Sequence, residues 1–199
     1  TLETVFFEAL PDVHERLARA FTGAYGRAPR ERARPLRMGS WVGGDRDGNP
    51  NVTAWVTADA LRLYRRGALV AYGRALAPIV AELTTSDLLV PVSPALRESV
   101  SRDVADAARI AQRVEGREIH EVYRFKANAA AVRLELALEE CDAHERPGTR
   151  GGYAGADAFA ADLDLMDESL RANRGARIAD IRLAGLSERV ASFGFRLAC

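Results

Sequence analysis

The sequence predicts a mainly α-helical chain, with one short strand before a glycine-rich loop and a second strand at the C-terminus. Three observations lead to this fold class. Long segments repeat apolar residues every three or four positions, which places them on one face of a helix. Clusters of glycine and proline separate these segments. Two strands divided by a long helical excursion are what a slice through a (β/α) barrel with large insertions would contain.

Residues 1–35 are predicted to form a helical lead-in and a connector. Apolar residues between positions 4 and 20 follow helical spacing, and Pro11 is expected in the first turn of a second helix. Residues 23–37 are rich in glycine, proline and arginine without periodicity, which is typical of a solvated connector. Residues 36–42 lead directly into glycines and predict the first strand.

A helical region is expected over residues 57–191. Thr57 resembles an N-cap, and Asp59 follows in the first turn, where a carboxylate suits the helix dipole. Apolar positions then continue to Leu83. At 1.5 Å per residue this helix would be roughly 40 Å long. We expect it to be the longest or second-longest helix of the chain.

Later segments alternate between helices and one loop. Ser93 and Pro94 predict the start of a new helix. Four glycines and a proline in residues 144–156 predict a loop, which we expect to be mobile. Residues 192–199 predict the second strand, cut by the end of the chain. Further helices are expected over residues 122–143, 159–172 and 178–191.

Composition excludes several classes of function. The 199 residues are 48% hydrophobic and 28% charged, as expected of a soluble globular protein with a real core. The 28 basic and 28 acidic side chains cancel, which argues against a nucleic-acid partner. No apolar run approaches the roughly 20 residues that span a bilayer, so we expect no membrane partner. The first residues are neither a Met start nor a signal region, so we expect a cytoplasmic chain that begins within a longer protein or after trimming.

Isolated cysteines and histidines offer no site. Cys141 and Cys199 lie outside any metal-binding pattern, so neither a disulfide nor a metal is expected. The three histidines, at positions 14, 120 and 144, have no catalytic context and are expected to be packing or surface residues. Lys126 is the only lysine, and we assign no function to this bias toward arginine.

The loop after the first strand carries the candidate site. Glycines allow the backbone to approach a ligand, and arginine offers a planar fork for phosphate or carboxylate. Flanking carboxylates could orient that fork or bind a divalent ion through water. The candidate residues are Trp41, Gly43, Gly44, Asp45, Arg46, Asp47, Gly48 and Asn49.

Three interpretations of this loop compete. A calcium loop is disfavoured because Pro50 and Val56 occupy positions six and twelve, where glycine and glutamate belong. A phosphate loop is disfavoured because neither glycine pattern of that kind is present. A purely structural loop, in which Arg46 only pairs with its neighbouring aspartates, stays open.

The letters SWVGGDRDGNPNVT at residues 40–53 resemble the SWxGGDRDGNPNVT signature of phosphoenolpyruvate carboxylases. Fourteen positions in that order are far more specific than a lone glycine pattern. Three other segments agree in order with the family: residues 3–12, residues 121–124 and residues 192–197. The resemblance therefore covers the whole chain, although only the loop is strongly diagnostic.

The resemblance implies an enzyme that carboxylates phosphoenolpyruvate with bicarbonate, giving oxaloacetate and phosphate, with Mg²⁺ or Mn²⁺. Such chemistry needs a metal, cations around the phosphoryl group and a proton-handling histidine. The family's histidine motif, metal carboxylates and mobile glycine and arginine loop are all missing here. The 199 residues are therefore expected to be an internal part of a homo-oligomeric parent, to bind no metal alone and to be inactive without the remainder of the parent chain.

The resemblance also implies roles for the loop. Arg46 would contact an anion or orient catalytic groups, and Asp45 and Asp47 would hold Arg46 and nearby cations. Trp41 would line the substrate cavity. The glycines would set the backbone, and Asn49 would cap or hydrogen-bond the turn. Two alternatives remain: a non-catalytic helical interaction module that retains the loop, or an excised structural fragment. An upstream T-x-x-H-P-T-E motif in the parent gene would favour the enzyme.

Overall fold

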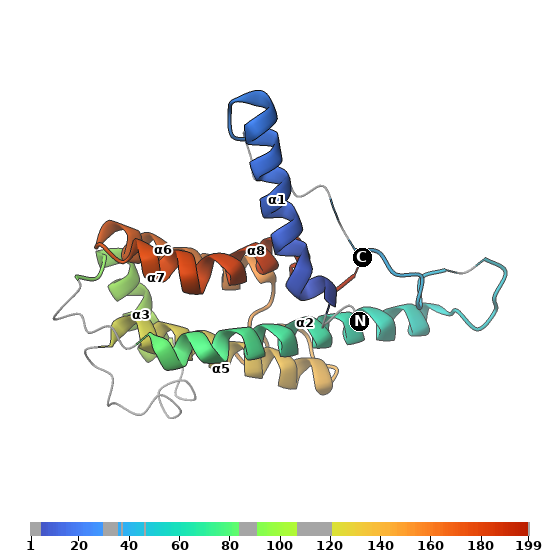
Figure 1. The fold of residues 1–199 in the computed structure, drawn as a ribbon. Coiled ribbons are helices and arrows are strands. Elements are labelled where there is room, and N and C mark those ends of the chain that lie inside the picture. The colour runs from blue at the N-terminus through green and yellow to red at the C-terminus, as the bar shows by residue number, and fades with distance from the viewer. Residues whose placement is uncertain are drawn as a thin grey trace. The chain divides into compact units, whose positions relative to one another are not determined.

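The computed structural model describes residues 5–29, 36, 38–45, 47–83, 91–106 and 121–198, with no account of the side chains of residues 105 and 106. These residues are mainly helical (Figure 1), which confirms the predicted class. The 29-residue α2 is the longest of the described helices, as predicted. The elements are α1 (Phe7–Tyr25), α2 (Ala54–Glu82), α3 (Pro94–Asp106), α5 (Val122–Asp142), α6 (Ala156–Ala172), α7 (Ala176–Ile178), the π-helical turn η2 (Ala179–Leu183) and α8 (Ala184–Phe193).

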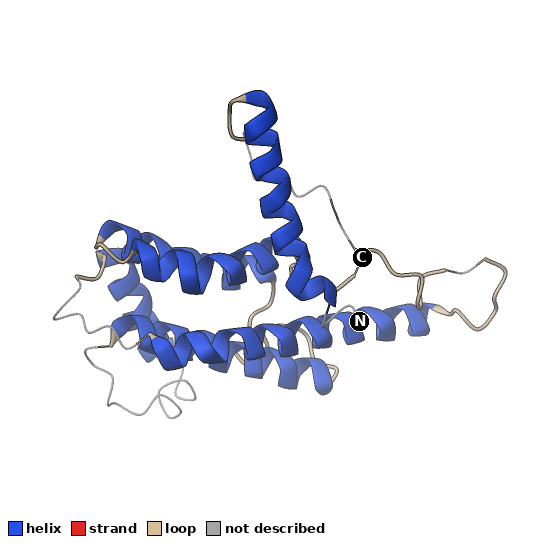
Figure 2. Ribbon diagram, viewed as in Figure 1, coloured by secondary structure: helices blue, strands red, loops and turns tan. Residues whose placement is uncertain are grey.

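The first predicted strand is wrong. Residues 36 and 38–42 form no strand, and Figure 2 shows loop between α1 and α2 in the part of the chain that is described. A strand needs a neighbouring strand for its backbone hydrogen bonds, and no described segment supplies one. The Ser40 hydroxyl instead accepts a bond from the Val42 amide at 3.2 Å, which turns the chain.

The second predicted strand is also wrong. Helix α8 continues to Phe193, and Gly194 follows it with a φ of 56°. The Gly194 amide donates to the Val190 carbonyl at 2.8 Å, which is the left-handed glycine ending of a helix. The pair Phe193-Gly194 therefore marks a helix C-terminus. Cys199, the last residue of the predicted strand, lies outside the described residues.

Helix α2 begins three residues earlier than predicted, because Thr53 is the capping residue and Thr57 is not. The Thr53 hydroxyl accepts a bond from the Val56 amide at 3.4 Å, and its carbonyl accepts from the Thr57 amide at 3.1 Å. Thr57 lies inside the helix, and its hydroxyl donates back to the Thr53 carbonyl at 3.2 Å. The predicted cap at Ser93 is confirmed, since its hydroxyl accepts from the Leu96 amide at 3.3 Å at the start of α3.

The N-terminal segment is one helix, where two were predicted. Pro11 lies inside α1 and has no amide to donate to the Phe7 carbonyl four residues earlier. Arg189 compensates for the missing donor, because its Nε donates to that carbonyl at 3.2 Å. Its guanidinium also pairs with Glu8. The helix therefore passes through the proline without an unsatisfied carbonyl at this position.

The chain divides into two compact units. Unit 1 comprises Thr1–Ala68 and Glu188–Cys199, and unit 2 comprises Leu69–Ser187. In unit 1, the rings of Phe7 and Phe193 lie 5.5 Å apart. His14 is buried there, with its Nδ1 3.4 Å from Glu188 and 3.3 Å from Ser192. Both contacts use the same ring nitrogen, so they do not form a catalytic triad.

Unit 2 is a helical core built mainly by α3, α5 and α6 with the second half of α2. The rings of Tyr72 and Tyr153 lie 5.6 Å and 5.3 Å from that of Phe159. The hydroxyls of Tyr123 and Ser169, both buried, lie 2.8 Å apart. In the described part of the chain, no helix is long and apolar enough to cross a membrane.

The loop after α5 is held by one buried carboxylate. Glu140 accepts three backbone bonds, from the amides of Gly148 at 2.8 Å, Arg150 at 2.6 Å and Gly152 at 3.2 Å. A Cβ at Gly152 would lie 2.3 Å from the Ala137 amide nitrogen, so only glycine fits against α5 there. The predicted loop is confirmed, and these bonds oppose the mobility expected from its glycine content.

Candidate functional site

The loop in front of α2 folds through turns that its own side chains close. The Trp41 carbonyl accepts bonds from the amides of Gly44 and Asp45, both at 3.2 Å. A carboxylate oxygen of Asp45 accepts the Asp47 amide at 3.1 Å. The side-chain oxygen of Asn49 accepts the Asn51 amide at 3.0 Å in the same manner. These side-chain turns are what aspartate and asparagine favour between glycines.

Two of the loop glycines adopt conformations that other residues avoid. Gly43 and Gly48 have φ angles of 73° and 70°. A Cβ at Gly43 would also lie 2.5 Å from the Cβ of Ala60 on α2, so the backbone passes too close for any side chain. Gly44 would meet nothing closer than 3.8 Å, an ordinary contact. The predicted backbone role therefore has a clear steric basis at Gly43.

Tyr64 joins the start of the loop to α2. Its hydroxyl lies 2.5 Å from the Ser40 hydroxyl and 3.1 Å from the Val42 carbonyl. Sequence analysis assigned no role to Tyr64 and missed this contact. The signal available in the sequence was weak: a tyrosine among aliphatic residues usually finds a partner for its hydroxyl.

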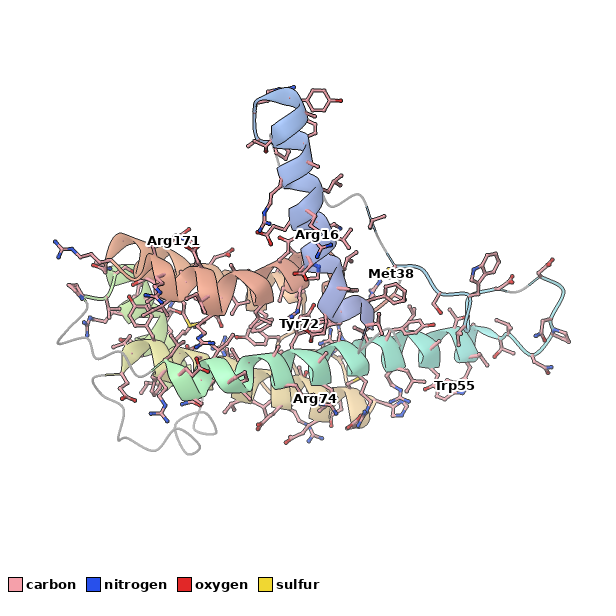
Figure 3. The ribbon with its side chains drawn as sticks, in the orientation of Figure 1. Arg16, Met38, Trp55, Tyr72, Arg74 and Arg171 are labelled. Carbon is pink, nitrogen blue, oxygen red and sulfur yellow. The ribbon has the colours of Figure 1, made fainter. Side chains whose placement is uncertain are left out.

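The predicted site residues are exposed within this chain. Trp41 is 80% exposed, and Asp45, Asp47 and Asn49 also face solvent. Trp55, in the first turn of α2, is 70% exposed and is labelled at that helix in Figure 3. Arg46 lies outside the described residues. The structure thus places the loop carboxylates and the Asn49 amide on one short segment that faces solvent.

A metal centre is not assembled by the described residues. They contain no group of three or more histidine, cysteine, aspartate or glutamate side chains close enough to hold an ion. In the loop, Asp45 and Asn49 each use a side-chain oxygen to close a backbone turn. We therefore assign no metal ligand among the residues that the structure describes.

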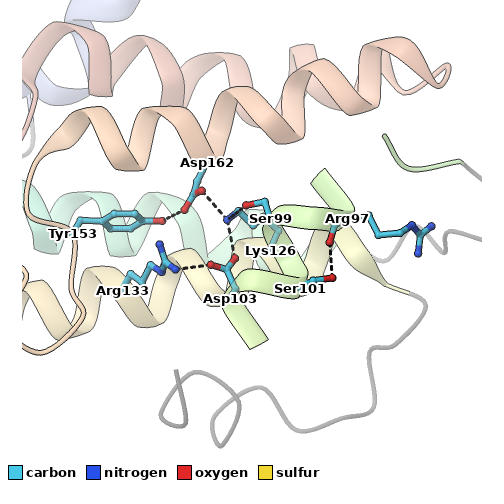
Figure 4. A network of polar contacts seen from close by, with 8 residues as sticks. All are labelled: Arg97, Ser99, Ser101, Asp103, Lys126, Arg133, Tyr153 and Asp162. Atoms are coloured by element: carbon cyan, nitrogen blue, oxygen red, sulfur yellow. Dashed lines mark hydrogen bonds and ion pairs between the residues drawn. The ribbon is translucent and has the colours of Figure 1, made fainter. Parts of the chain in front are cut away.

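A second polar cluster lies inside unit 2, and sequence analysis missed it. Lys126, on α5, is 1% exposed and uses all three ammonium donors. They reach Ser99 at 2.8 Å, Asp103 at 2.7 Å and Asp162 at 2.7 Å (Figure 4). The acceptors lie on α3 and α6, so one lysine joins three helices. The signal was the single lysine of the chain among apolar α5 residues.

Two further side chains complete this cluster. Arg133 pairs with the second oxygen of Asp103 at 2.6 Å, and the Tyr153 hydroxyl donates to Asp162 at 2.5 Å. Burial raises the pKa of the Tyr153 phenol well above its ordinary value, and the neighbouring Asp162 carboxylate adds to the rise. Two cations and two carboxylates balance, so the cluster is a charge-balanced structural network with no ammonium donor left for chemistry.

The described fold and loop define a class: a helical segment with a glycine-bounded polar loop in front of a long helix. A family model for phosphoenolpyruvate carboxylase matches residues 1–199, the whole chain. The chain belongs to the phosphoenolpyruvate carboxylase family, which confirms the resemblance found in its sequence.

Curated relatives agree with this assignment. A phosphoenolpyruvate carboxylase of Xanthomonas oryzae pv. oryzae is 36% identical over 197 residues, covering 99% of this chain and 21% of the relative. One from Nocardia farcinica is 37% identical over 196 residues, covering 98% of this chain and 21% of the relative. One from Ralstonia nicotianae is 35% identical over 204 residues, covering 98% of this chain and 20% of the relative. The chain thus spans about a fifth of these relatives' length.

Proposed function

We propose that these residues are one section of a longer phosphoenolpyruvate carboxylase, which carboxylates phosphoenolpyruvate with bicarbonate to give oxaloacetate and phosphate. The observation that carries this proposal is the family match over all 199 residues, joined to the fourteen-residue loop signature. Relatives about five times longer support the view that the remaining machinery lies elsewhere in the parent. The parent is proposed to be a cytoplasmic homo-oligomer.

The loop would supply part of the substrate pocket. Because Asp45 accepts the Asp47 amide, the turn brackets position 46 with two exposed carboxylates. We propose that they orient the Arg46 guanidinium toward a phosphate or carboxylate of the substrate, which its planar fork suits. The exposed Trp41 would form a wall of a cavity that the rest of the parent completes.

A divalent ion, Mg²⁺ or Mn²⁺, would supply charge stabilisation for the enolate and phosphoryl oxygens in the parent. The described residues do not fit such an ion, because they gather no set of three candidate ligands. We therefore propose that its ligands lie outside the described residues, as the resemblance to the family implies. The contribution of this chain is the geometry of the loop and the helices that hold it.

Replacing Arg46 by lysine in the full-length parent tests the proposal. Lysine keeps the charge but cannot reproduce the planar fork. We expect a fall in kcat/KM for phosphoenolpyruvate of roughly 10-fold to 1,000-fold, the range for losing one oriented charged contact. Oxaloacetate formation with bicarbonate and Mg²⁺ measures the rate, and thermal unfolding measures Tm.

The matched control is Arg150→Lys, in the loop after α5. Arg150 pairs with Glu145 at 2.5 Å and has Glu139 at 3.8 Å, so the change affects an ion-paired loop arginine with no proposed role in catalysis. Its kinetics should stay close to those of the unsubstituted parent. Arg46→Lys with normal kinetics and a lowered Tm would instead support the purely structural interpretation of the loop.

A further inference from the structure

Helix α1 carries an apolar stripe that is only partly covered. Phe6, Leu10, Val13, Leu17 and Phe21 recur at intervals of three and four, so they share one face of the helix. Leu10 is 4% exposed, whereas Val13 and Leu17 are 42% and 44% exposed. We call Val13, Leu17 and Phe21 the α1 stripe. Phe21 is half-buried and its ring lies 4.5 Å from that of Tyr25, so the stripe is exposed mainly at Val13 and Leu17.

Exposed apolar side chains are unevenly divided between the two units. Among the described residues, every exposed large hydrophobic side chain except Val104 and Ile181 belongs to unit 1. Unit 2 therefore buries its apolar residues within itself, while unit 1 leaves many uncovered. Contiguous apolar surface on one part of a soluble protein marks a place where another surface packs.

We propose that the α1 stripe docks in an apolar groove formed by the part of the parent polypeptide outside residues 1–199. This inference rests on the proposed function, which makes the chain a section of a longer protein. The relatives supply the occupant: residues 1–199 align with 21% of their length, so about four-fifths of such a polypeptide lies outside this chain. The stripe's spacing fits a helix-in-groove contact with anchors at i, i+4 and i+8.

The opposite face of α1 indicates which side stays in water. Glu15 and Arg19 form an ion pair there, with side chains 60% and 72% exposed. Both positions are rotated by about 160° from Leu17 on the helix. The helix thus has an apolar face that the described residues cover only in part and a solvated charged face, as expected of an element that packs on one side only.

Thiol labelling tests the proposal by comparing the isolated chain with the full-length parent. Leu17→Cys places a thiol on the α1 stripe, and Arg19→Cys is the matched control on the charged face. Mass spectrometry of the peptide containing each new cysteine reports its rate of alkylation, independent of Cys141 and Cys199. We expect Cys at position 17 to react at least about tenfold more slowly in the parent, because labelling there would require local opening. Position 19 should react at similar rates in both.

Hydroxyl-radical footprinting of Leu17 in the unsubstituted proteins repeats the comparison, in case the substitution prevents the parent from folding. Equal reactivity of position 17 in chain and parent would overturn the proposal. Protection that grows with the concentration of the isolated chain would also overturn it, because a second copy would then be the occupant. The readout does not depend on carboxylase activity. A parent that protects position 17 but produces no oxaloacetate contradicts the proposed function alone.

Discussion

Lys126 shows at the scale of one residue why a side chain's geometry matters beyond its charge. Apart from three histidines, all other basic residues of the chain are arginines, yet this position has lysine. Three acceptors, Ser99, Asp103 and Asp162, surround one nitrogen at 2.7–2.8 Å. A compact ammonium with three donors satisfies them from one point, whereas the donors of a guanidinium lie in a plane.

Replacing Lys126 by methionine should destabilise the chain by about 3–5 kcal/mol, since two buried carboxylates would lose their shared cation. Urea unfolding followed by circular dichroism measures the change. The control is Arg171→Met, which removes an exposed pair with Asp167 and Asp180 and should destabilise the chain far less, because water screens the pair. Equal effects of the two substitutions would show that the buried network contributes little more than a surface pair.

Tyr153 makes the contribution of the same network to folding stability depend on pH. Its pKa is raised above the ordinary value of 10.0, first by burial and then by the Asp162 carboxylate. The phenol ionises more readily in the unfolded chain, so its contribution to stability is complete below pH 10 and declines as the pH rises further. Unfolding midpoints in urea between about pH 8 and pH 11 should therefore fall more steeply for the unsubstituted chain than for Tyr153→Phe. Parallel curves for the two proteins would contradict this assignment.

At the scale of elements, side chains complete the backbone bonds that the helices and loops leave open. Arg189 serves the Phe7 carbonyl that Pro11 cannot, and Thr53 serves the first amides of α2. Glu140 does the same for three amides of the loop after α5. Each contact satisfies a backbone group that would otherwise remain without a partner.

Glu140→Gln should loosen the loop after α5. The neutral amide keeps one acceptor oxygen but turns a second oxygen into a donor, facing backbone donors that it cannot satisfy. We expect a loss of about 1.5–3 kcal/mol, typical of hydrogen bonds to a charged group. Faster trypsin cleavage after Arg150 would report local opening, since Pro147 blocks cleavage after Arg146.

The control for this substitution is Glu139→Gln, one residue earlier on α5. Glu139 is 42% exposed and lies 3.8 Å from Arg150, so its loss should change cleavage little. If both variants were cleaved at the same rate, the buried carboxylate would not be what holds the loop.

At the scale of the whole molecule, the two units differ in how completely they bury apolar surface. Unit 2 surrounds Tyr72, Phe159 and Lys126 with its own helices. Unit 1 holds the signature loop and leaves Trp41, Trp55 and the α1 stripe exposed. The loop is thus shaped by local contacts, and we expect the remainder of the proposed parent to cover the exposed apolar surfaces of unit 1.

The isolated 199 residues should therefore form no oxaloacetate from phosphoenolpyruvate and bicarbonate with Mg²⁺. The chain lacks the family's histidine and metal-ligand motifs, and its loop residues face solvent. A coupled assay at high protein concentration measures this, with the full-length parent as the positive control. Turnover above the blank by the purified chain would contradict the expectation.

Much of the fold could be predicted because its signals are local. Helical periodicity identified α2, α5 and α6 to within a few residues, and Ser93 marked the start of α3. The candidate loop was also visible, because an unbroken order of glycines, aspartates and asparagines needs no tertiary information. Both predicted strands failed, since strand formation depends on a pairing partner that a local pattern cannot supply.

Local sequence by itself thus determined the helices, the polar loop and the family to which the chain belongs. Only the tertiary structure decided which polar side chains are buried and what they contact. Lys126 reaches acceptors 23 and 27 residues before it and one 36 residues after it, and Arg189 reaches a carbonyl 182 residues away. The physical reason is distance along the chain: helical spacing reports neighbours within a turn, whereas these contacts exist only after helices pack.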